Sequence, residues 1–287
     1  GCLPALSFYP EVRRHKVIEI KNLSKTFKTA DSSLDALKNV SLTINDGDIY
    51  GIIGMSGAGK STLFNAIAGM FYVDDGILRL DGRDITFLPP HKRSRRIGHL
   101  FQDPLKGTAP HMTIEENLAV AYLRAPEKHK QLRRVSRKDR EFFSDALAQL
   151  DMGLEERMNT PVGLLSGGQR QALTLLMATM VTPELLLLDE HTAALDPVTA
   201  DKVLALTRSI VSERSISCLM ITHTMHQALE LGSRTLMMDA RRIVLDVSGA
   251  QRADMTVQGL IDAFAAQAGT AFDNDRVLLS TAEGTEN

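Results

Sequence analysis

The chain has 287 residues, of which 44% are hydrophobic, and a formal net charge of −2 at pH 7. This length, hydrophobic fraction and net charge predict a soluble α/β domain with a small satellite domain, and they exclude fibrous and disordered proteins. No stretch reaches the roughly eighteen apolar residues of a membrane span, and Cys2 and Cys218 indicate a reduced cytosolic protein rather than a disulfide scaffold.

The first predicted elements are strands. After an N-terminal arm at residues 1–16, the alternating apolar residues of 17–21 and 40–44 predict a small antiparallel sheet. Residues 49–53 form a short apolar run, which is typical of a buried parallel strand. A glycine-rich segment follows this run directly, and we expect a helix to begin near Lys60.

The glycine-rich segment matches the phosphate-loop pattern G-x-x-x-x-G-K-[ST] through Gly54, Met55, Ser56, Gly57, Ala58, Gly59, Lys60, Ser61 and Thr62. Its backbone N–H groups and the positive end of the following helix suit an anion. Lys60 would neutralise the β and γ phosphates of ATP, and the Ser61 hydroxyl would ligate Mg²⁺. A plain glycine-rich turn is the alternative, which the order of strand, loop and helix disfavours.

A helical insertion follows the next strands, which we predict at residues 77–80 and 97–101. Thr113 and Glu116 form a capping box, and apolar residues recur at helical spacing at Phe142, Phe143, Ala146, Leu147 and Leu150. We predict an inserted helical subdomain over residues 103–165. Its basic cluster at 128–138 is interpreted first as a solvated face, with anionic lipid or nucleic acid as alternatives.

A second anion-binding device is formed by Ser166, Gly167, Gly168 and Gln169. Ser166 fits a helix N-cap with Gln169 three residues on, and the helix that begins there presents free N–H groups. Alone, such a run is more often an ordinary helix start. Together with the phosphate loop, it predicts a second phosphate-binding device in the same chain.

Strands and helices alternate through the rest of the chain. Strands are predicted at 185–189, 218–222, 235–239 and 242–247, and Asp196 before Pro197 predicts an N-capped helix. We predict an α/β fold with a P-loop NTPase (RecA-like) core at 17–102 and 166–250, a small antiparallel β subdomain and the inserted α-helical subdomain. Residues 251–287 are expected to form a C-terminal helix and a polar tail.

Two acids end the apolar strand at 185–188, where open α/β sheets place their ligand sites. Asp189 would hold Mg²⁺ through water, and Glu190 would orient or deprotonate the attacking water. The alternative is a solvated strand end, which the phosphate loop in the same chain makes less favourable. These residues predict an ATPase.

With these motifs in order, the chain resembles the ATP-binding subunits of ABC transporters over residues 17–264. The resemblance implies that Phe27 stacks on adenine and that Gln102 senses the metal and the attacking water. It also implies that Asp196 lies in the loop that crosses to a partner subunit, and that His223 contacts the γ phosphate.

The resemblance also implies an assembly. Two copies pack head to tail, so that the Ser166 loop of one copy closes over the ATP held by residues 54–62 of the other. Separate membrane permease subunits carry the transport path, and their coupling helices enter the groove between Gln102 and the inserted helices. A substrate-binding protein acts indirectly, nucleic acid is not a partner, and the chain lies at the cytoplasmic face of the inner membrane as a peripheral subunit.

Residues 101–110 and 189–197 resemble a bacterial importer subgroup associated with tryptophan- or tyrosine-type amino-acid uptake. His191 departs from the Pro or Ala common in the family, and we interpret it as a packing residue rather than a second base. Two alternatives stay open: the energising subunit of an exporter, and a non-transport ATPase that acts as an ATP-dependent switch. The short interval between Lys60 and Ser166 excludes the coiled-coil repair ATPases of the superfamily.

Overall fold

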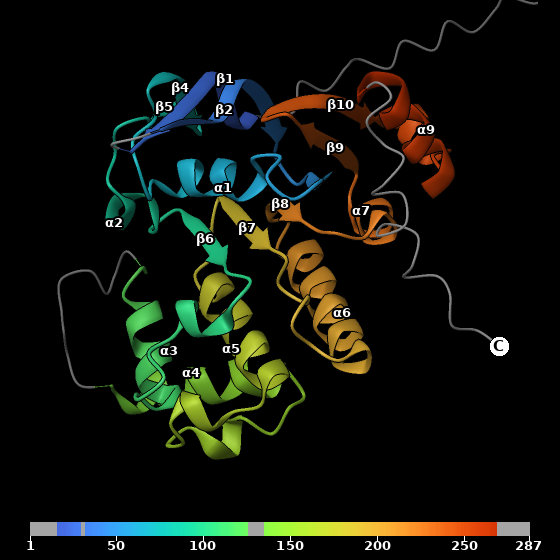
Figure 1. The fold of residues 1–287 in the computed structure, drawn as a ribbon. Helices are drawn as coiled ribbons and strands as arrows, with labels where there is room; N and C mark the ends of the chain where they lie inside the picture. The colour runs from blue at the N-terminus through green and yellow to red at the C-terminus, as the bar shows by residue number, and fades with distance from the viewer. Residues whose placement is uncertain (1–15, 30–31, 126–134, 269–287) are drawn as a thin grey trace, which may run out of the picture.

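The computed structural model describes residues 16–29, 32–125 and 135–268, and it contains two β-sheets with a helix between them (Figure 1). Most of the N-terminal arm, most of the basic cluster 128–138 and the polar tail from residue 269 lie outside the described residues. The described segments contain the phosphate loop, the Ser166 device and the two acids at 189 and 190.

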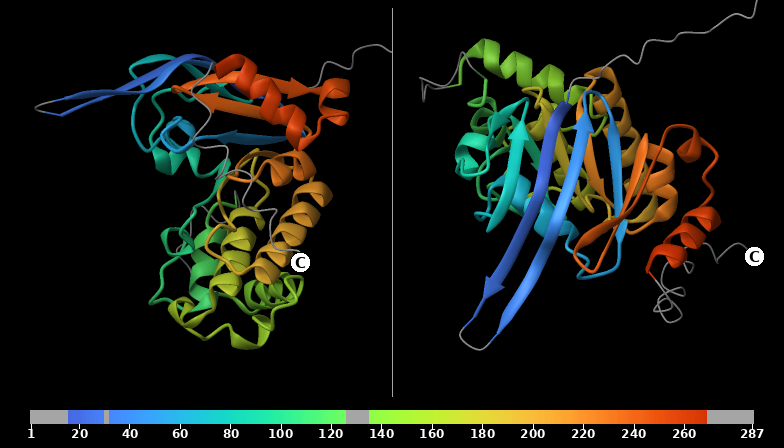
Figure 2. Two further views of the ribbon diagram at one scale, coloured as in Figure 1. Left: turned by 45° about the vertical axis from the view of Figure 1, so that its right-hand side comes forward. Right: turned by 90° about the horizontal axis from the view of Figure 1, so that it is seen from above.

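The smaller sheet is antiparallel, in the strand order β2-β1-β4-β5. A long hairpin builds half of it, and its two strands extend well beyond the rest of the molecule (Figure 2). The pairing of residues 17–21 with 40–44 confirms the predicted antiparallel sheet, although both strands run further than the periodicity indicated. The strands are β1 (Lys16–Lys28), β2 (Ser33–Asn45), β4 (Asp75–Leu80) and β5 (Arg83–Asp84).

The larger sheet has six strands in the order β10-β9-β3-β8-β7-β6, and all neighbours are parallel except β10 and β9. The central strands are buried on both faces, which explains their uninterrupted apolar sequence. Because β3, β8 and β7 are neighbours, the segments that follow them meet at one edge. The strands are β3 (Ile49–Gly54), β6 (Ile97–Leu100), β7 (Leu185–Asp189), β8 (Ser217–Ile221), β9 (Arg234–Asp239) and β10 (Arg242–Ser248).

Helices cover both faces of the larger sheet. One hydrophobic cluster joins α1 to both sheets through Leu63, Phe64 and Ile67, while a second packs α5 and α6 on the opposite face. A third hydrophobic cluster packs α7 and α9 against the part of the sheet that contains β9, through Met225, Leu260 and other residues. These helices are α1 (Lys60–Ala68), α2 (Pro90–Arg93), α6 (Pro197–Glu213), α7 (Met225–Leu231), α8 (Gly249–Ala253) and α9 (Val257–Ala268).

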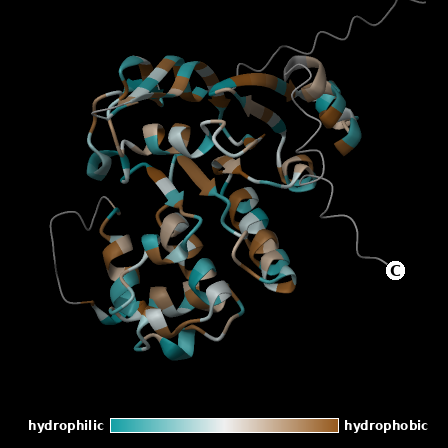
Figure 3. Cartoon of the chain, viewed as in Figure 1, coloured by the Kyte–Doolittle hydropathy of each residue, from teal (hydrophilic) through white to brown (hydrophobic). Residues whose placement is uncertain are grey.

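The predicted helical insertion has a hydrophobic core of its own, built around Ile114, Phe143, Leu147 and Leu173. Figure 1 places these helices below the two sheets, and Figure 3 shows that hydrophobic and hydrophilic residues alternate along them. Both predicted capping boxes at Thr113 and Ser166 are confirmed. The elements are η1 (Pro104–Gly107), α3 (Ile114–Tyr122), α4 (Arg137–Ala148), η2 (Glu155–Arg157), η3 (Val162–Leu164) and α5 (Gly167–Thr179).

Helix α5 belongs to two cores at once. Leu173 and Leu176 pack in the helical insertion, whereas Leu175 and Ala178 pack beneath the six-stranded sheet. The predicted boundary at residue 166 therefore falls at the start of a helix that both units share. The domain division itself stays a prediction.

Candidate nucleotide site

One cavity of about 460 Å³ opens at the edge where β3, β7 and β8 end. The phosphate loop forms its floor, and residues far apart in the sequence form its walls. It is lined by Leu34, Ala36, Ser56, Gly57, Ala58, Gly59, Lys60, Ser61, Thr62, Gln102, Glu190, His223 and Arg241. The structure therefore brings most of the phosphate loop together with Gln102, Glu190 and His223, and their roles toward a nucleotide stay predictions.

The phosphate loop needs glycine where its backbone turns. Gly54 has φ +152°, and a Cβ atom added to it would overlap the carbonyl oxygen of Met238 in β9. Gly59, the N-cap of α1, has φ +101°. Both values lie in the region that L-residues with a side chain rarely adopt, so the loop conformation follows from these glycines.

Lys60 is almost fully buried, and its ammonium group reaches back into the loop. Nζ donates hydrogen bonds to the carbonyl oxygens of Gly54 at 2.6 Å and Met55 at 3.0 Å. Burial lowers the pKa of Lys60, an effect that the nearby charges of Glu190 and Asp189 oppose. Phosphate oxygens offer this ammonium group charged acceptors, which form stronger hydrogen bonds than carbonyls do.

Asp189 and Glu190 put two carboxyl groups at the end of β7. Burial, with the neighbouring charge of Glu190, raises the pKa of Asp189 to about 6. A bound cation would relieve this cost, and oxygen ligands are those that Mg²⁺ prefers. The donors that the sequence named, Ser61, Gln102 and Asp189, therefore fit a magnesium ion chemically.

Glu190 is held in an unusual conformation and faces His223. Its φ is +45°, which is uncommon for a residue with a side chain and is found often at functional sites. Oε2 of Glu190 lies 2.6 Å from Nε2 of His223, with side-chain exposures of 9% for Glu190 and 55% for His223. The pair spans the ends of the neighbouring strands β7 and β8.

Phe27 does not line the cavity, although Leu34, its partner across the β1–β2 hairpin, does. The Phe27 ring packs edge-on against Phe71, with centroids 5.1 Å apart, and the Lys25 ammonium lies 5.4 Å from its centroid. It is 40% exposed. Its role in stacking on adenine stays a prediction.

The Ser166 device lies outside this cavity. Ser166 Oγ accepts from the backbone N–H of Gln169 at 3.2 Å, and the Gln169 side chain accepts from the Ser166 N–H at 3.3 Å. Asp196 caps α6 by accepting from the N–H of Thr199 at 3.1 Å. Gly168 packs so closely on Thr199 that a Cβ atom there would overlap its Cγ2 atom. The predicted crossing loop and the Ser166 device are thus adjacent.

His191 follows Glu190 but turns away from the cavity. It is 3% exposed, its Nε2 atom lies 3.2 Å from Oγ1 of Thr207 in α6, and burial lowers its pKa to about 4. Thr207 Oγ1 donates to the carbonyl of Val203 at 2.8 Å, so the imidazole N–H donates to Thr207. This arrangement supports the packing interpretation of His191.

Sequence reasoning missed three residues of the cavity: Leu34, Ala36 and Arg241. The first two lie on β2, which reaches the phosphate loop through the folding of the hairpin. Arg241 lies in the turn between β9 and β10. None belongs to a local motif, and only the strand order that places them here could have found them.

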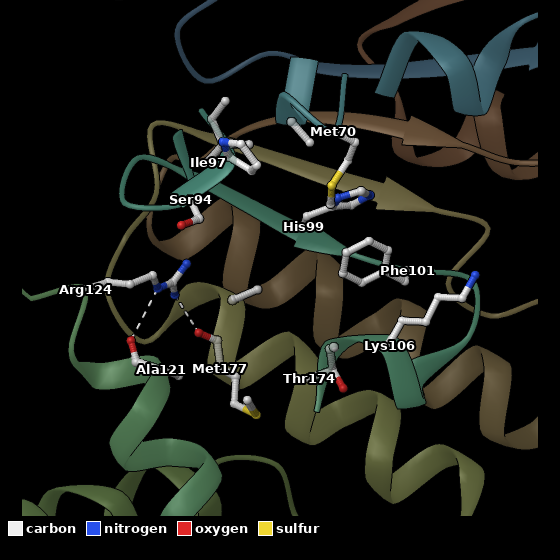
Figure 4. Close-up of a pocket in the computed structure, with 14 residues that line it drawn as sticks. Met70, Ser94, Ile97, His99, Phe101, Lys106, Ala121, Arg124, Thr174 and Met177 are labelled. Carbon is white, nitrogen blue, oxygen red and sulfur yellow. Dashed lines mark hydrogen bonds between the residues drawn. The ribbon is translucent and has the colours of Figure 1, made fainter. Parts of the chain in front are cut away.

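A second, smaller cavity of about 270 Å³ lies between the six-stranded sheet and the helical insertion (Figure 4). Apolar side chains line most of it, with Lys106 and Arg124 at its margins. The Arg124 guanidinium donates to the carbonyl oxygens of Ala121 and Met177, as Figure 4 shows. The lining residues are Ala68, Met70, Pro90, Ser94, Ile97, His99, Phe101, Lys106, Gly107, Ala121, Arg124, Thr174, Met177 and Ala178.

In the part of the chain that the structure describes, every helix is too short or too polar to cross a membrane. Within the same residues, His, Cys, Asp and Glu side chains do not gather in threes as they would around a transition metal.

Known proteins are similar to this chain in sequence. The ABC transporter family model matches residues 37–193. A tyrosine transport ATP-binding protein of Clostridioides difficile is 39% identical over 86% of this chain and 98% of its own length. A methionine import ATP-binding protein of Enterococcus faecalis is 35% identical over 79% of this chain, and the match spans 64% of that longer protein.

Solved structures agree with the sequence comparisons. A dimeric ATP-binding cassette in a post-hydrolysis state with ADP and Pi has a TM-score of 0.70 and 27% identity, covering 80% of this chain and 98% of that one. A nucleotide-free ATP-binding cassette of an ABC transporter has a TM-score of 0.70 and 25% identity, covering 87% of this chain and 98% of that one.

Proposed function

Because the chain belongs to the ABC transporter family, we propose that it hydrolyses ATP to drive import of a small organic solute, an amino acid, through separate membrane permease subunits. The observation that supports this best is the placement of Glu190 and His223 beside the phosphate loop in one cavity. These are the groups that hydrolysis of a terminal phosphate requires: a cradle, a base and a polar contact.

Each cavity residue that the sequence predicted has a role in this proposal. The backbone N–H groups of residues 54–62 and Lys60 hold the phosphates, and Glu190 orients the attacking water and accepts its proton. His223, which holds the Glu190 carboxylate, contacts the γ phosphate. Gln102, which follows β6 at the entry to the helical insertion, orients the water from the other side.

Mg²⁺ is part of the proposal. Ser61, Gln102 and, through water, Asp189 would hold it, and the ion supplies positive charge to the phosphate oxygens. The supporting observation is the raised pKa of Asp189, which shows that a negative charge is costly there without a cation.

The active unit in this proposal is a head-to-tail dimer. The Ser166 device lies outside the cavity that the same chain forms, so another copy must supply it to a nucleotide bound at residues 54–62. The dimeric cassette among the similar structures supports this arrangement. Two nucleotides then join the two copies, and loss of a γ phosphate removes contacts that favour the closed state.

The second cavity is the proposed permease site. It is concave and mainly apolar, and it carries Lys106 and Arg124, which suits an amphipathic helix of a membrane subunit. The chain would then lie at the cytoplasmic face of the membrane as a peripheral subunit, with a substrate-binding protein acting through the permease. The printed names of the relatives favour an amino acid, with tyrosine as the first candidate.

The test is reconstitution of the chain with its native permease subunits and binding protein in liposomes. We expect one amino acid to raise phosphate release and to accumulate inside at the expense of ATP. Tyrosine and methionine are compared with a sugar and a metal-ion control. ATP turnover without uptake of any solute would contradict import, and efflux would favour the exporter alternative.

A further inference from the structure

We propose that Arg241 is a nucleotide-binding residue whose guanidinium contacts the α phosphate, at the end of the cavity away from Glu190. The inference rests on the proposed function and adds a contact that the local motifs of the chain do not contain. Arg241 lines the cavity together with Gly57, Gly59 and Ala36.

The backbone of Arg241 is held against the phosphate loop. Arg241 and the preceding Ala240 have φ values of +69° and +43°, which form a tight turn between β9 and β10. The carbonyl oxygen of Arg241 accepts a hydrogen bond from the backbone N–H of Lys38 at 3.0 Å. A Cβ atom added to Gly59 would lie 3.5 Å from Cα of Arg241, so the turn packs directly on the loop.

The strand order decides which part of a nucleotide Arg241 can reach. In the larger sheet, β3 lies between β9 and β8, so Arg241 is on one side of the phosphate loop. Glu190 and His223, which follow β7 and β8, are on the other. If the γ phosphate faces Glu190, the α phosphate and the nucleoside extend toward Arg241, Ala36 and Leu34.

The charge of Arg241 is available for this contact. Among the described residues, no hydrogen bond or ion pair engages its guanidinium. Its charge acts only weakly on Asp35, whose pKa is lowered first by the Thr26 hydroxyl, then by Lys38 and least by the Arg241 charge. The guanidinium fork matches two phosphate oxygens, which is the geometry that arginine binds best.

The experiment measures binding of MgATP and MgADP to the full chain by titration calorimetry, and ATP turnover at saturating nucleotide. Arg241→Ala is expected to raise the Kd of MgATP and of MgADP by about tenfold. The two increases should be equal, because both nucleotides carry the α phosphate. The kcat at saturation should stay within about twofold, since the contact is equal before and after hydrolysis. Arg241→Lys should recover part of the affinity.

Two variants separate charge from backbone. Arg241→Gly removes the guanidinium but tolerates φ +69°, so it should lose the same affinity as Arg241→Ala. Arg242→Ala removes an exposed neighbouring cation outside the cavity and should bind as wild type. The inference is overturned if Arg241→Ala binds both nucleotides with a Kd within twofold of the wild-type value. It is also overturned if Arg242→Ala loses as much nucleotide affinity as Arg241→Ala does. Failure of the wild-type chain to hydrolyse ATP would instead contradict the proposed function.

Discussion

Nε2 of His223 lies 2.6 Å from Oε2 of Glu190, which joins the residues that follow the neighbouring strands β8 and β7. The half-exposed imidazole therefore fixes a nearly buried carboxylate at the edge where the phosphate loop also lies. If a γ phosphate is to reach His223, the imidazole must share or exchange this contact. Binding of ATP would thus also reposition the proposed base.

Replacement of the proposed base should separate binding from chemistry. Glu190→Gln keeps the size of the side chain and a carbonyl acceptor for His223, but it cannot take a proton from water. We expect unchanged ATP affinity, turnover lower by about 10²–10⁴, and a closed dimer trapped by ATP. Phosphate release and size-exclusion chromatography measure these effects. Near-normal turnover would refute the assignment of Glu190.

The raised pKa of Asp189 predicts a pH-dependent stability of the ligand-free chain. Since its pKa is about 6 in the folded state and near 3.8 when unfolded, the folded state binds more protons between these values, and stability falls as pH rises through them. Asp189→Asn should remove this loss of folding stability at high pH. At pH 8 we expect the variant to be more stable by up to about 3 kcal/mol.

The measurement for Asp189 is urea unfolding of both proteins at pH 8 and at pH 4, without nucleotide and with EDTA. The advantage of Asp189→Asn should disappear at pH 4, where the wild-type carboxyl is protonated in the folded state. An equal difference at both pH values would show that the substitution acts through packing instead of charge.

The proposed site built from two copies predicts complementation. Lys60→Met disables the phosphate loop, and Ser166→Asp keeps an N-cap but faces the triphosphate with a negative charge. Each variant alone should be inactive. In a random mixture half of the dimers are mixed and one of their two sites is intact, so turnover should recover to about a quarter of wild type.

Ser166→Asn is the matched control for complementation, because it caps the helix without a charge. It should retain most of the turnover. A mixture of the two disabled variants that stays inactive, although mixed dimers form, would refute a site built from two copies.

The close packing of Gly168 on Thr199 predicts that a substitution at Thr199 can restore the stability lost by a substitution at Gly168. Gly168→Ala places a methyl group where Cγ2 of Thr199 lies, and overpacking of this kind costs about 1–3 kcal/mol. Thr199→Ser removes that methyl carbon but keeps the backbone N–H that Asp196 caps. The double variant should therefore unfold near the wild-type temperature in thermal denaturation. Additive losses would contradict the packing.

His191 should contribute to stability rather than chemistry. Its bond to Thr207 is buried, so His191→Ala should cost about 1–3 kcal/mol in urea unfolding and leave kcat of the surviving enzyme within about threefold. Thr207→Val, which leaves the imidazole N–H without an acceptor, should cost a similar amount. A large fall in kcat for both variants with normal stability would assign His191 a role in hydrolysis.

The depressed pKa of His191 gives this prediction a pH signature. The unfolded imidazole binds a proton near pH 6.5, whereas the folded one does so near pH 4, so stability is lost as pH falls between these values. His191→Ala should lose stability less steeply in this window. His99, whose pKa burial also lowers to about 4, accounts for a remaining slope.

Local patterns predicted much of the site. The phosphate loop, the capping box at Ser166 and the acids after β7 each follow from residues that are close in sequence. Leu34, Ala36 and Arg241 were missed because their place in the cavity depends on strand order. Likewise, no periodicity could show that α5 packs in two cores, or that Phe27 rests against Phe71.

Helix α5 is a continuous rod of 13 residues, about 20 Å long, that starts at the Ser166 cap. Thr174, Met177 and Ala178, in its second half, form a wall of the cavity between the sheet and the helical insertion. Because the helix is rigid, one of its ends cannot tilt unless the other end moves too. Any rotation imposed at Ser166 must displace that wall as well, so the proposed nucleotide contact and the proposed permease site would move together.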